Sequence, residues 1–259
     1  MWELDFISEE DFRNHVKNTI FHYGEKLTSY DLRRFNSNTV DPIKLIFDKA
    51  VYQYSWEEII KNEISRQRDK ANNNDIGYFH QCIFQYIDGC TVPRAGWDVI
   101  FRKEGGVEVP ECGRVKTIYV EMKNKHNTMN SSSSAKAYMK MQGQLLKDDD
   151  CACYLVEAIA KQSQNITWSA SVDGIKQKHR RIRRVSMDEF YKTVTGQDDA
   201  FYKMCMVLPS VIEEVISMSE SFTTPNDTVY QELQQIALEK SSSFAMALYM
   251  LGFESYLGF

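Results

Sequence analysis

The chain lacks an apolar run long enough to span a bilayer, and its first ten residues contain no basic segment followed by an apolar core. A membrane-spanning helix needs about 20 predominantly apolar residues, and a secretory signal peptide needs that amino-terminal pattern. These absences argue against a membrane protein and against a secreted one. We therefore expect a cytoplasmic protein with no membrane partner.

Cysteines in paired CxxC spacing are also missing, although the chain has six cysteines, at positions 82, 90, 112, 151, 153 and 205. Cys151 and Cys153 lie in a strand-like stretch, where they are either two reduced thiols or half of a zinc site. The lack of a second pair favours reduced thiols. We predict no structural metal.

The sequence has no excess of positive charge, since its formal net charge is −5. Positive charge is nevertheless concentrated in residues 176–184, where six of nine residues are Lys or Arg: Lys176, Lys178, Arg180, Arg181, Arg183 and Arg184. Such local density can steer a polyanion toward an acidic protein. The alternative is a solvated basic turn with no partner.

A hydrophobic share of 43% and a charged share of 26% are ordinary for a soluble, folded chain of 259 residues. There is no internal repeat and no linker, so we expect one α/β domain with extra helices rather than two domains. Before residue 100 the apolar spacing and capping residues predict helices at 8–23, 42–51, 55 to about 70, and 76–87, the first opened by a capping box of Ser8 and Asp11.

After residue 96 the pattern changes to short β-like runs at 97–102 and 116–123, which Gly- and Pro-containing turns join into a hairpin. Residues 130–135 are predicted as a polar loop before a helix that ends near Leu146, and 151–159 as a buried strand. This order predicts a mixed sheet with helices packed on it. Further along we expect a loop at 166–174 that continues into the basic run, a helix opened by Ser186 as a capping box, and a helical final quarter.

Three residues on the predicted hairpin carry a chemical signal. Glu121 and Lys123 alternate with Met122, so they point the same way, and Asp98 lies on the preceding strand. Two carboxylates and an ammonium in one site suit phosphodiester hydrolysis, because carboxylates hold Mg²⁺ and a lysine can orient the attacking water. The alternative is an ordinary row of charges on the wet face of a hairpin. Polar groups at the end of a buried strand, however, are costly unless they bind something.

These residues resemble a known family. Asp98 with Glu121-x-Lys123 looks like the PD-(D/E)xK nuclease core, and the longer strings are similar to type II restriction endonucleases that cut the palindrome GGNCC. The strings are 63–67, 76–81, 96–98, 121–128, 154–157, 190–196 and 208–209, so the resemblance covers roughly residues 40 to 215. Trp97 stands where the motif's name has Pro. The resemblance implies a restriction-endonuclease-like α/β fold, a mixed sheet flanked by helices, in a single endonuclease domain 1–259 with a catalytic core at about 55–160.

The resemblance also implies roles for individual residues. Asp98, Glu121 and the backbone carbonyl of Met122 would hold Mg²⁺, while Lys123 would position the nucleophile. Glu63 is a candidate additional carboxylate, or else a helix charge paired with Arg66 or Gln67. His80 and Gln81 are possible active-site neighbours, although a histidine among aromatic residues is more often a packing residue.

DNA contacts are expected in two elements, at about 124–134 and 165–185. His126 and Asn127 match the first letters of an HNH nuclease motif, but the further histidine elements of that motif are missing, so DNA contact is the better interpretation. Basic side chains would contact phosphates or guanine, and the sequence does not assign each one. The predicted DNA-binding residues are Lys125, His126, Asn127, Thr128, Lys176, Lys178, Arg180, Arg181, Arg183 and Arg184.

A palindromic target implies a homodimer that delivers one active site to each strand of double-stranded DNA. The apolar run 244–251 is a candidate for its interface or, equally, for core packing. The resemblance further implies a bacterial restriction-modification system with a cognate DNA methyltransferase as a separate partner. Two other functions stay open: a repair or branched-DNA nuclease of the same fold, and a DNA-binding module without catalysis.

Overall fold

The computed structural model describes residues 2–126, 128–218 and 224–256. The chain divides into two compact units, one formed by Met1–Ile20 with Ile76–Ser219 and the other by Phe21–Asp75 with Glu220–Phe259. The single domain expected from the sequence stays a prediction. Within the described residues, no helix has the length and apolar character needed to cross a membrane.

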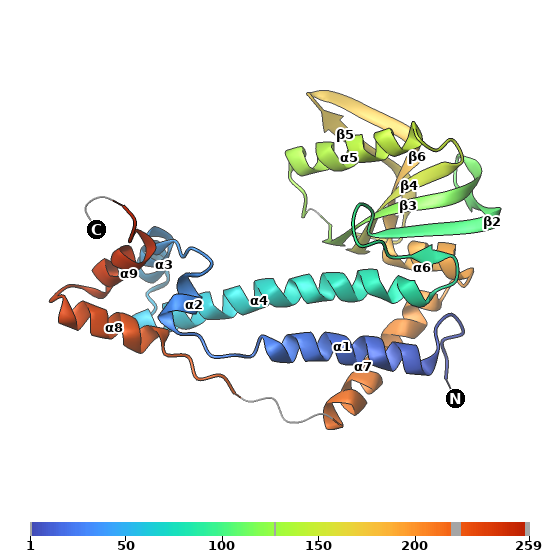
Figure 1. Cartoon of the computed structure of the whole chain (residues 1–259). Helices are drawn as coiled ribbons and strands as arrows, with labels where there is room; N and C mark the ends of the chain where they lie inside the picture. The colour runs from blue at the N-terminus through green and yellow to red at the C-terminus, as the bar shows by residue number, and fades with distance from the viewer. Residues whose placement is uncertain (1, 127, 219–223, 257–259) are drawn as a thin grey trace. The chain divides into compact units, whose positions relative to one another are not determined.

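The first unit is built around a mixed sheet, whose six strands within the described residues follow the order β1-β2-β3-β4-β6-β5 (Figure 1). β3 runs parallel to β4 and β4 parallel to β6, whereas the other neighbours are antiparallel. The strands are β1 (Cys90–Thr91), β2 (Val99–Val109), β3 (Gly113–Lys125), β4 (Cys151–Ile159), β5 (Asn165–Val172) and β6 (Ile175–Ser186). The α/β fold class, the hairpin and the buried strand at 151–159 are therefore confirmed.

Helices cover both faces of this sheet (Figure 1). One face packs against α5 (Ser131–Leu145), where Tyr138 and Met141 meet Leu155 of β4. The other face packs against α6 (Met187–Thr195) and α7 (Ala200–Ser217), and the core there includes Phe190 and Tyr154. Because both faces are covered, β4 is buried over its first seven residues and reads as an apolar run.

α1 (Glu9–Glu25) and α4 (Trp56–Cys82) begin within one residue of the helix starts predicted at Ser8 and Ser55. α1 opens with the predicted capping box, since the Ser8 hydroxyl accepts from the Asp11 backbone N–H at 3.1 Å and donates to its carboxylate at 2.7 Å. α4 merges two predicted helices and is followed by the 3-10 turn η1 (Ile83–Tyr86).

The second unit is helical. Its core joins α2 (Leu32–Asn36), α3 (Pro42–Tyr52), α8 (Val229–Glu239), α9 (Phe244–Gly252) and part of α4. Ala247 and Leu248 are buried in that core, and Phe244 stacks on Trp56 with ring centroids 5.0 Å apart. The apolar run 244–251 thus packs internally, as one of its two interpretations predicts.

The prediction of a loop at 130–135 was wrong, because the four serines form the first turn of α5. Asn130 is the residue that caps this helix, and its side-chain oxygen accepts from the Ser133 N–H at 2.9 Å. Serine and asparagine favour helix starts for the same reason that they favour loops, since their side chains satisfy free backbone groups. Composition alone therefore does not distinguish a helix start from a loop.

The loop predicted at 166–174 and the basic turn were also wrong, since these residues form the β5–β6 hairpin. Asp173 and Gly174 make its turn, and both have positive φ. The polar composition hides the strands because Lys176, Lys178 and Arg180 alternate on an exposed face. α6 does begin after Ser186, but the Ser186 hydroxyl binds the backbone N–H of Gln164 rather than capping the helix.

All six cysteines are free thiols, and Cys151 and Cys153 are buried in β4. Burial raises the pKa of the Cys90 thiol to about 12. A thiol with a raised pKa stays protonated and is a poor metal ligand.

Candidate active site

Asp98 and Glu121 are brought together by the pairing of β2 with β3. The Asp98 backbone N–H donates to the Val120 carbonyl at 3.0 Å, one position beyond the last paired residues of the two strands. One Asp98 carboxylate oxygen then accepts from the Met122 N–H at 2.7 Å. The register of the hairpin therefore places the Asp98 carboxylate beside the Glu121–Lys123 segment.

Lys123 lies on the same face of β3 as Glu121, as the alternation predicts. Its Nζ donates to Glu121 Oε1 at 2.8 Å. The two side chains are 29% and 18% exposed, so the pair is partly shielded from water but still reachable.

The two carboxylates have opposite pKa shifts. Burial raises the pKa of Asp98; the Met122 N–H opposes this shift, and the nearby Glu121 charge adds to it. Burial would also raise the pKa of Glu121, but hydrogen bonds from Lys123 and Lys140 outweigh it and lower that pKa. The Glu121 charge thus acts on Asp98, and a cation bound between the two carboxylates would stabilise both charged forms.

The donor set fits a hard divalent cation. The described residues contain no cluster of three or more His, Cys, Asp or Glu side chains that could hold a metal. Two carboxylates and a backbone carbonyl are nevertheless oxygen ligands of the kind that Mg²⁺ takes while keeping several waters. Asp98, Glu121 and the Met122 carbonyl are thus the residues present for such an ion.

Lys140 is a site residue that the sequence analysis missed. It extends from α5, and its Nζ donates to Glu121 Oε2 at 2.6 Å and to the Gly96 carbonyl at 2.5 Å. It also lies 4.2 Å from the centre of the Trp97 ring. No local pattern reveals it, because its neighbours depend on how α5 packs across the sheet.

Glu157 is a second residue near the site that the sequence analysis missed. The sequence feature that could have revealed it is a charged residue within the otherwise apolar strand β4. It pairs in register with Lys123 and is almost fully buried. Its Oε1 accepts from Arg184 Nε at 3.0 Å, and its Oε2 lies 3.1 Å from His126 Nδ1. The buried carboxylate therefore fixes two of the predicted DNA-binding side chains beside the candidate metal site.

Gln81 and His80 lie near the end of α4. Gln81 Nε2 donates to the Asp98 backbone carbonyl at 3.2 Å, so it contacts the site's main chain. Burial and the nearby His15 lower the pKa of His80 to about 4, and its ring lies against Phe79. A neutral, packed imidazole agrees with the packing interpretation, and a catalytic role of either residue stays a prediction.

Glu63 belongs to the second unit. Both of its carboxylate oxygens bind Arg66, at 2.5 and 2.7 Å, and Oε1 also accepts from Gln67 at 3.2 Å. The pairing matches the alternative interpretation, but Glu63 is buried rather than on the helix surface. Its role as an additional active-site carboxylate remains a prediction.

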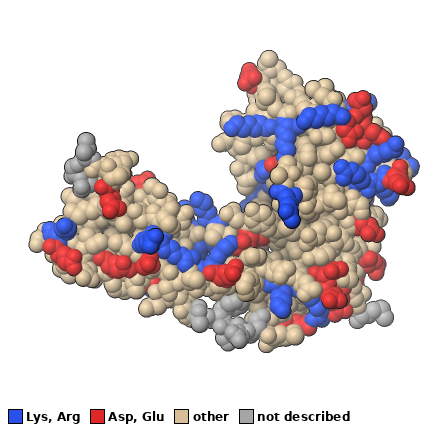
Figure 2. Space-filling model, viewed as in Figure 1, with Lys and Arg blue, Asp and Glu red and all other residues tan. Residues whose placement is uncertain are grey.

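At the end of β3, Lys125 is exposed and Thr128 binds its carbonyl at 3.0 Å. Asn127 lies outside the described residues. The basic strand β6 exposes Lys176, Lys178 and Arg180, and Lys and Arg side chains form a band over the sheet-bearing unit (Figure 2). Arg181 is partly exposed and donates to the Asp149 carbonyl at 2.5 Å.

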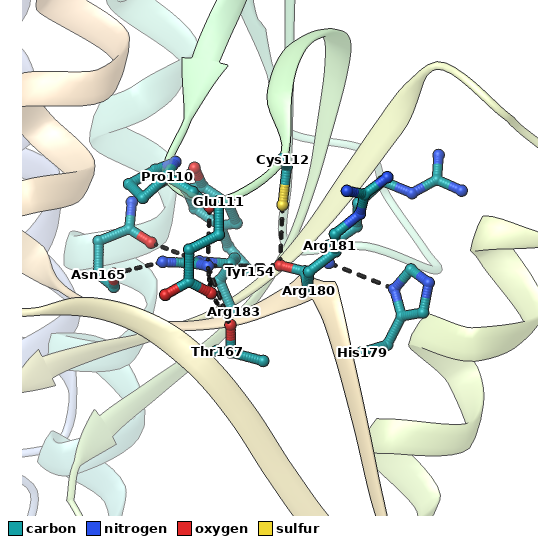
Figure 3. Close-up of polar contacts among 10 residues, drawn as sticks. All are labelled: Pro110, Glu111, Cys112, Tyr154, Asn165, Thr167, His179, Arg180, Arg181 and Arg183. Carbon is teal, nitrogen blue, oxygen red and sulfur yellow. Dashed lines mark hydrogen bonds and ion pairs between the residues drawn. The ribbon is translucent and has the colours of Figure 1, made fainter.

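Arg183 is the exception in β6, because its side chain is fully buried. Its guanidinium binds the Pro110 carbonyl at 2.9 Å and both oxygens of Asn165, at 2.5 and 2.9 Å (Figure 3). Thr167 and Glu111 complete the network at 3.0 and 3.3 Å. The predicted DNA contact of Arg183 is therefore corrected, since its guanidinium is directed into the protein, where it ties the β2–β3 turn to β5.

A mixed sheet flanked by helices, with two carboxylates and a lysine on one hairpin and a basic strand two positions away in the sheet, is consistent with a restriction-endonuclease-like fold. A family model described as Eco47II restriction endonuclease matches residues 4–217, and the chain belongs to this family of type II restriction enzymes. The chain is similar to the type II restriction enzyme Sau96I of Staphylococcus aureus, with 28% identity over 99% of this chain and 98% of that protein. It is also 28% identical to the type II restriction enzyme Eco47II of Escherichia coli, over 83% of this chain and 88% of that protein.

Proposed function

We propose that this chain is a Mg²⁺-dependent endonuclease that cleaves double-stranded DNA at a short palindrome, GGNCC. Membership of a restriction endonuclease family supports DNA cleavage, and the similarity of segment 121–128 to GGNCC-cutting enzymes supports the target. The observation that carries the proposal is the convergence of Asp98, Glu121 and Lys123 at one end of the β2–β3 hairpin.

Each residue has a role that follows from its contacts. Asp98, Glu121 and the Met122 carbonyl would hold Mg²⁺, which when bound polarises a phosphate oxygen and acidifies a water. The Met122 N–H holds the Asp98 carboxylate in place, so little reorganisation is needed on binding. Lys123 keeps an ammonium next to Glu121, where it can orient a water for in-line attack.

The DNA would be held by the basic side chains that the structure leaves accessible. Phosphate contacts position the duplex and base contacts specify it, so we propose a mixture of both along the end of β3 and along β6. The recognition elements 124–134 and 165–185 remain as predicted, apart from Arg183. The basic residues of the set are Lys125, His126, Lys176, Lys178, Arg180, Arg181 and Arg184, and Thr128 is a polar member. Asn127, which lies outside the described residues, also stays in the proposed set.

Incubation of the full chain with plasmid DNA and Mg²⁺ tests the proposal. We expect discrete fragments whose sequenced ends all lie at GGNCC, and no cleavage when the metal is chelated. Asp98→Asn removes a ligand charge but keeps the acceptor for the Met122 N–H, so cleavage is expected to fall by about 100-fold or more. Fragments with unrelated ends would contradict the proposed target.

The same experiment separates the alternatives. A repair or branched-DNA nuclease would leave linear duplex intact and cut branched substrates instead. A DNA-binding module would bind duplex DNA equally with and without Mg²⁺, and Asp98→Asn would change nothing. A cognate methyltransferase is proposed as a separate partner, so DNA premethylated at the target site is expected to resist cleavage.

A further inference from the structure

Lys140 is held inside the candidate active site from three sides. Its Nζ contacts Glu121 Oε2 at 2.6 Å, the Gly96 carbonyl at 2.5 Å and the face of the Trp97 ring at 4.2 Å. Its side chain is 35% exposed, so an open path to solvent remains. A lysine with four rotatable bonds can leave such a position without any backbone movement.

Glu121 consequently carries an ammonium on each carboxylate oxygen, with Lys123 on Oε1 and Lys140 on Oε2. A divalent cation on the same carboxylate would lie within a few ångströms of two positive charges. Repulsion at such distances is strong in a partly buried site, and releasing one lysine side chain also restores its rotamer entropy. Lys123 belongs to the strand that carries Glu121, whereas Lys140 comes from a separate helix and is the group free to withdraw.

We propose that Lys140 is a built-in competitor of the metal ion: it occupies Glu121 Oε2 in the metal-free protein and moves off Glu121 and Trp97 when a divalent cation binds. This inference rests on the proposed function, because it takes Glu121 as a metal ligand. Lys140 is a positioning residue in this scheme, since it controls the ligand and does not touch the reacting atoms. Metal binding then depends on displacing an internal charge.

Metal affinity in the absence of DNA tests the competition. Isothermal titration of the full chain with Mn²⁺ is expected to show about ten-fold tighter binding for Lys140→Met, because the competing charge is gone. Lys136→Met is the matched control, since Lys136 is exposed on the same helix and its loss changes the net charge equally. Its affinity should equal that of the unmodified chain. Unchanged or weaker binding in Lys140→Met would overturn the inference.

Trp97 offers an independent optical readout, since removal of the ammonium from its ring should change its emission. We expect a Mn²⁺-dependent change in tryptophan fluorescence in the unmodified chain and in Lys136→Met. The change should be lost in Trp97→Phe and in Lys140→Met. A full change in Lys140→Met would show that the lysine does not move and would refute the displacement.

Two further variants keep the results interpretable. Lys140→Gln replaces Lys140→Met if thermal unfolding shows that the methionine variant is not folded. Asp98→Asn separates the two proposals: if it binds Mn²⁺ as well as the unmodified chain does, the metal site itself is wrong and the proposed function fails. If Asp98→Asn loses Mn²⁺ while both Lys140 variants bind normally, only the role of Lys140 fails.

Discussion

The folded protein favours the protonated form of the Asp98 carboxyl group. Burial and the neighbouring Glu121 raise its pKa, even though the Met122 N–H donates to it. A carboxyl group with a raised pKa in the folded state binds more protons there than in the unfolded chain, so its ionisation destabilises the fold. A cation bound at this carboxylate, as proposed above, would offset that cost.

Asp98→Asn is therefore expected to stabilise the metal-free protein while it abolishes cleavage. Asparagine keeps the acceptor for the Met122 N–H and removes the buried charge, for a gain of about 1 kcal/mol in the free energy of unfolding at neutral pH. The gain should shrink as the pH falls through the pKa of Asp98, where the wild-type carboxyl becomes protonated. Urea denaturation at several pH values measures this difference.

The control is Asp149→Asn, which neutralises an exposed aspartate after α5. Its effect on unfolding should stay within about 0.5 kcal/mol at every pH. If Asp98→Asn proves less stable than the unmodified chain at neutral pH, the carboxylate contributes favourable contacts that outweigh its burial.

At the scale of elements, β6 divides its arginines between structure and surface. Arg183 points inward and joins the β2–β3 turn to β5 through Pro110 and Asn165, while Arg180 points outward (Figure 3). The β5–β6 pairing is irregular between Lys178 and Arg183, so simple strand alternation does not decide these directions. Neighbouring basic residues of one strand can therefore have unrelated roles.

Arg183→Met should cost about 2 to 3 kcal/mol in the free energy of unfolding, because it leaves the buried carbonyls of Pro110 and Asn165 without a donor. Arg180→Met should change stability by no more than about 0.5 kcal/mol. Chemical denaturation of both variants provides the comparison. Equal stability of the two would mean that the Arg183 network contributes little.

In DNA binding, Arg180→Met should have a larger effect than Arg183→Met. Removing the exposed Arg180 is expected to weaken binding to any sequence and to lower the salt dependence of the affinity by about one released counterion. Arg183→Met, if folded, should keep the slope of the unmodified chain. Fluorescence anisotropy over a series of salt concentrations distinguishes them, and an unaffected slope in Arg180→Met would remove Arg180 from the proposed DNA surface.

For the whole molecule, the palindromic target predicts a symmetric homodimer. Two identical strands cut at related phosphates require two active sites related by the twofold axis of the DNA. Sedimentation velocity is expected to show a species with twice the mass of one chain, and a duplex with one site should bind two chains. A monomer at concentrations that support complete cleavage would contradict this assembly.

The distribution of charge over the whole molecule also bears on DNA binding. The chain carries −5 overall, yet its basic side chains gather on β6 and at the end of β3, so the local field differs in sign from the total. Attraction of this kind acts over about 10 Å at moderate salt, which is shorter than the protein. An acidic protein can therefore hold DNA through one basic surface.

The sequence alone was enough to predict what depends on near neighbours in the chain. The alternation of Glu121 and Lys123, the hairpin that carries Asp98, the buried strand at 151–159 and the first helix with its capping box follow from periodicities of two and 3.6 residues. The loops predicted at 130–135 and 166–174 failed because serine-rich and basic stretches are compatible with several local structures. Packing against the sheet selects among them.

Only the tertiary structure decided which distant residues share the site. Lys140 reaches Glu121 because α5 packs on one face of the sheet, over β4, β5 and β6. Glu157 holds Arg184 and His126 because β4 lies between β3 and β6. Strand order determines these contacts, and it results from long-range packing that leaves no periodic signal in the chain. The sequence was thus enough to predict the three residues of the proposed nuclease site. The surroundings that set their charge and geometry could not be predicted from it.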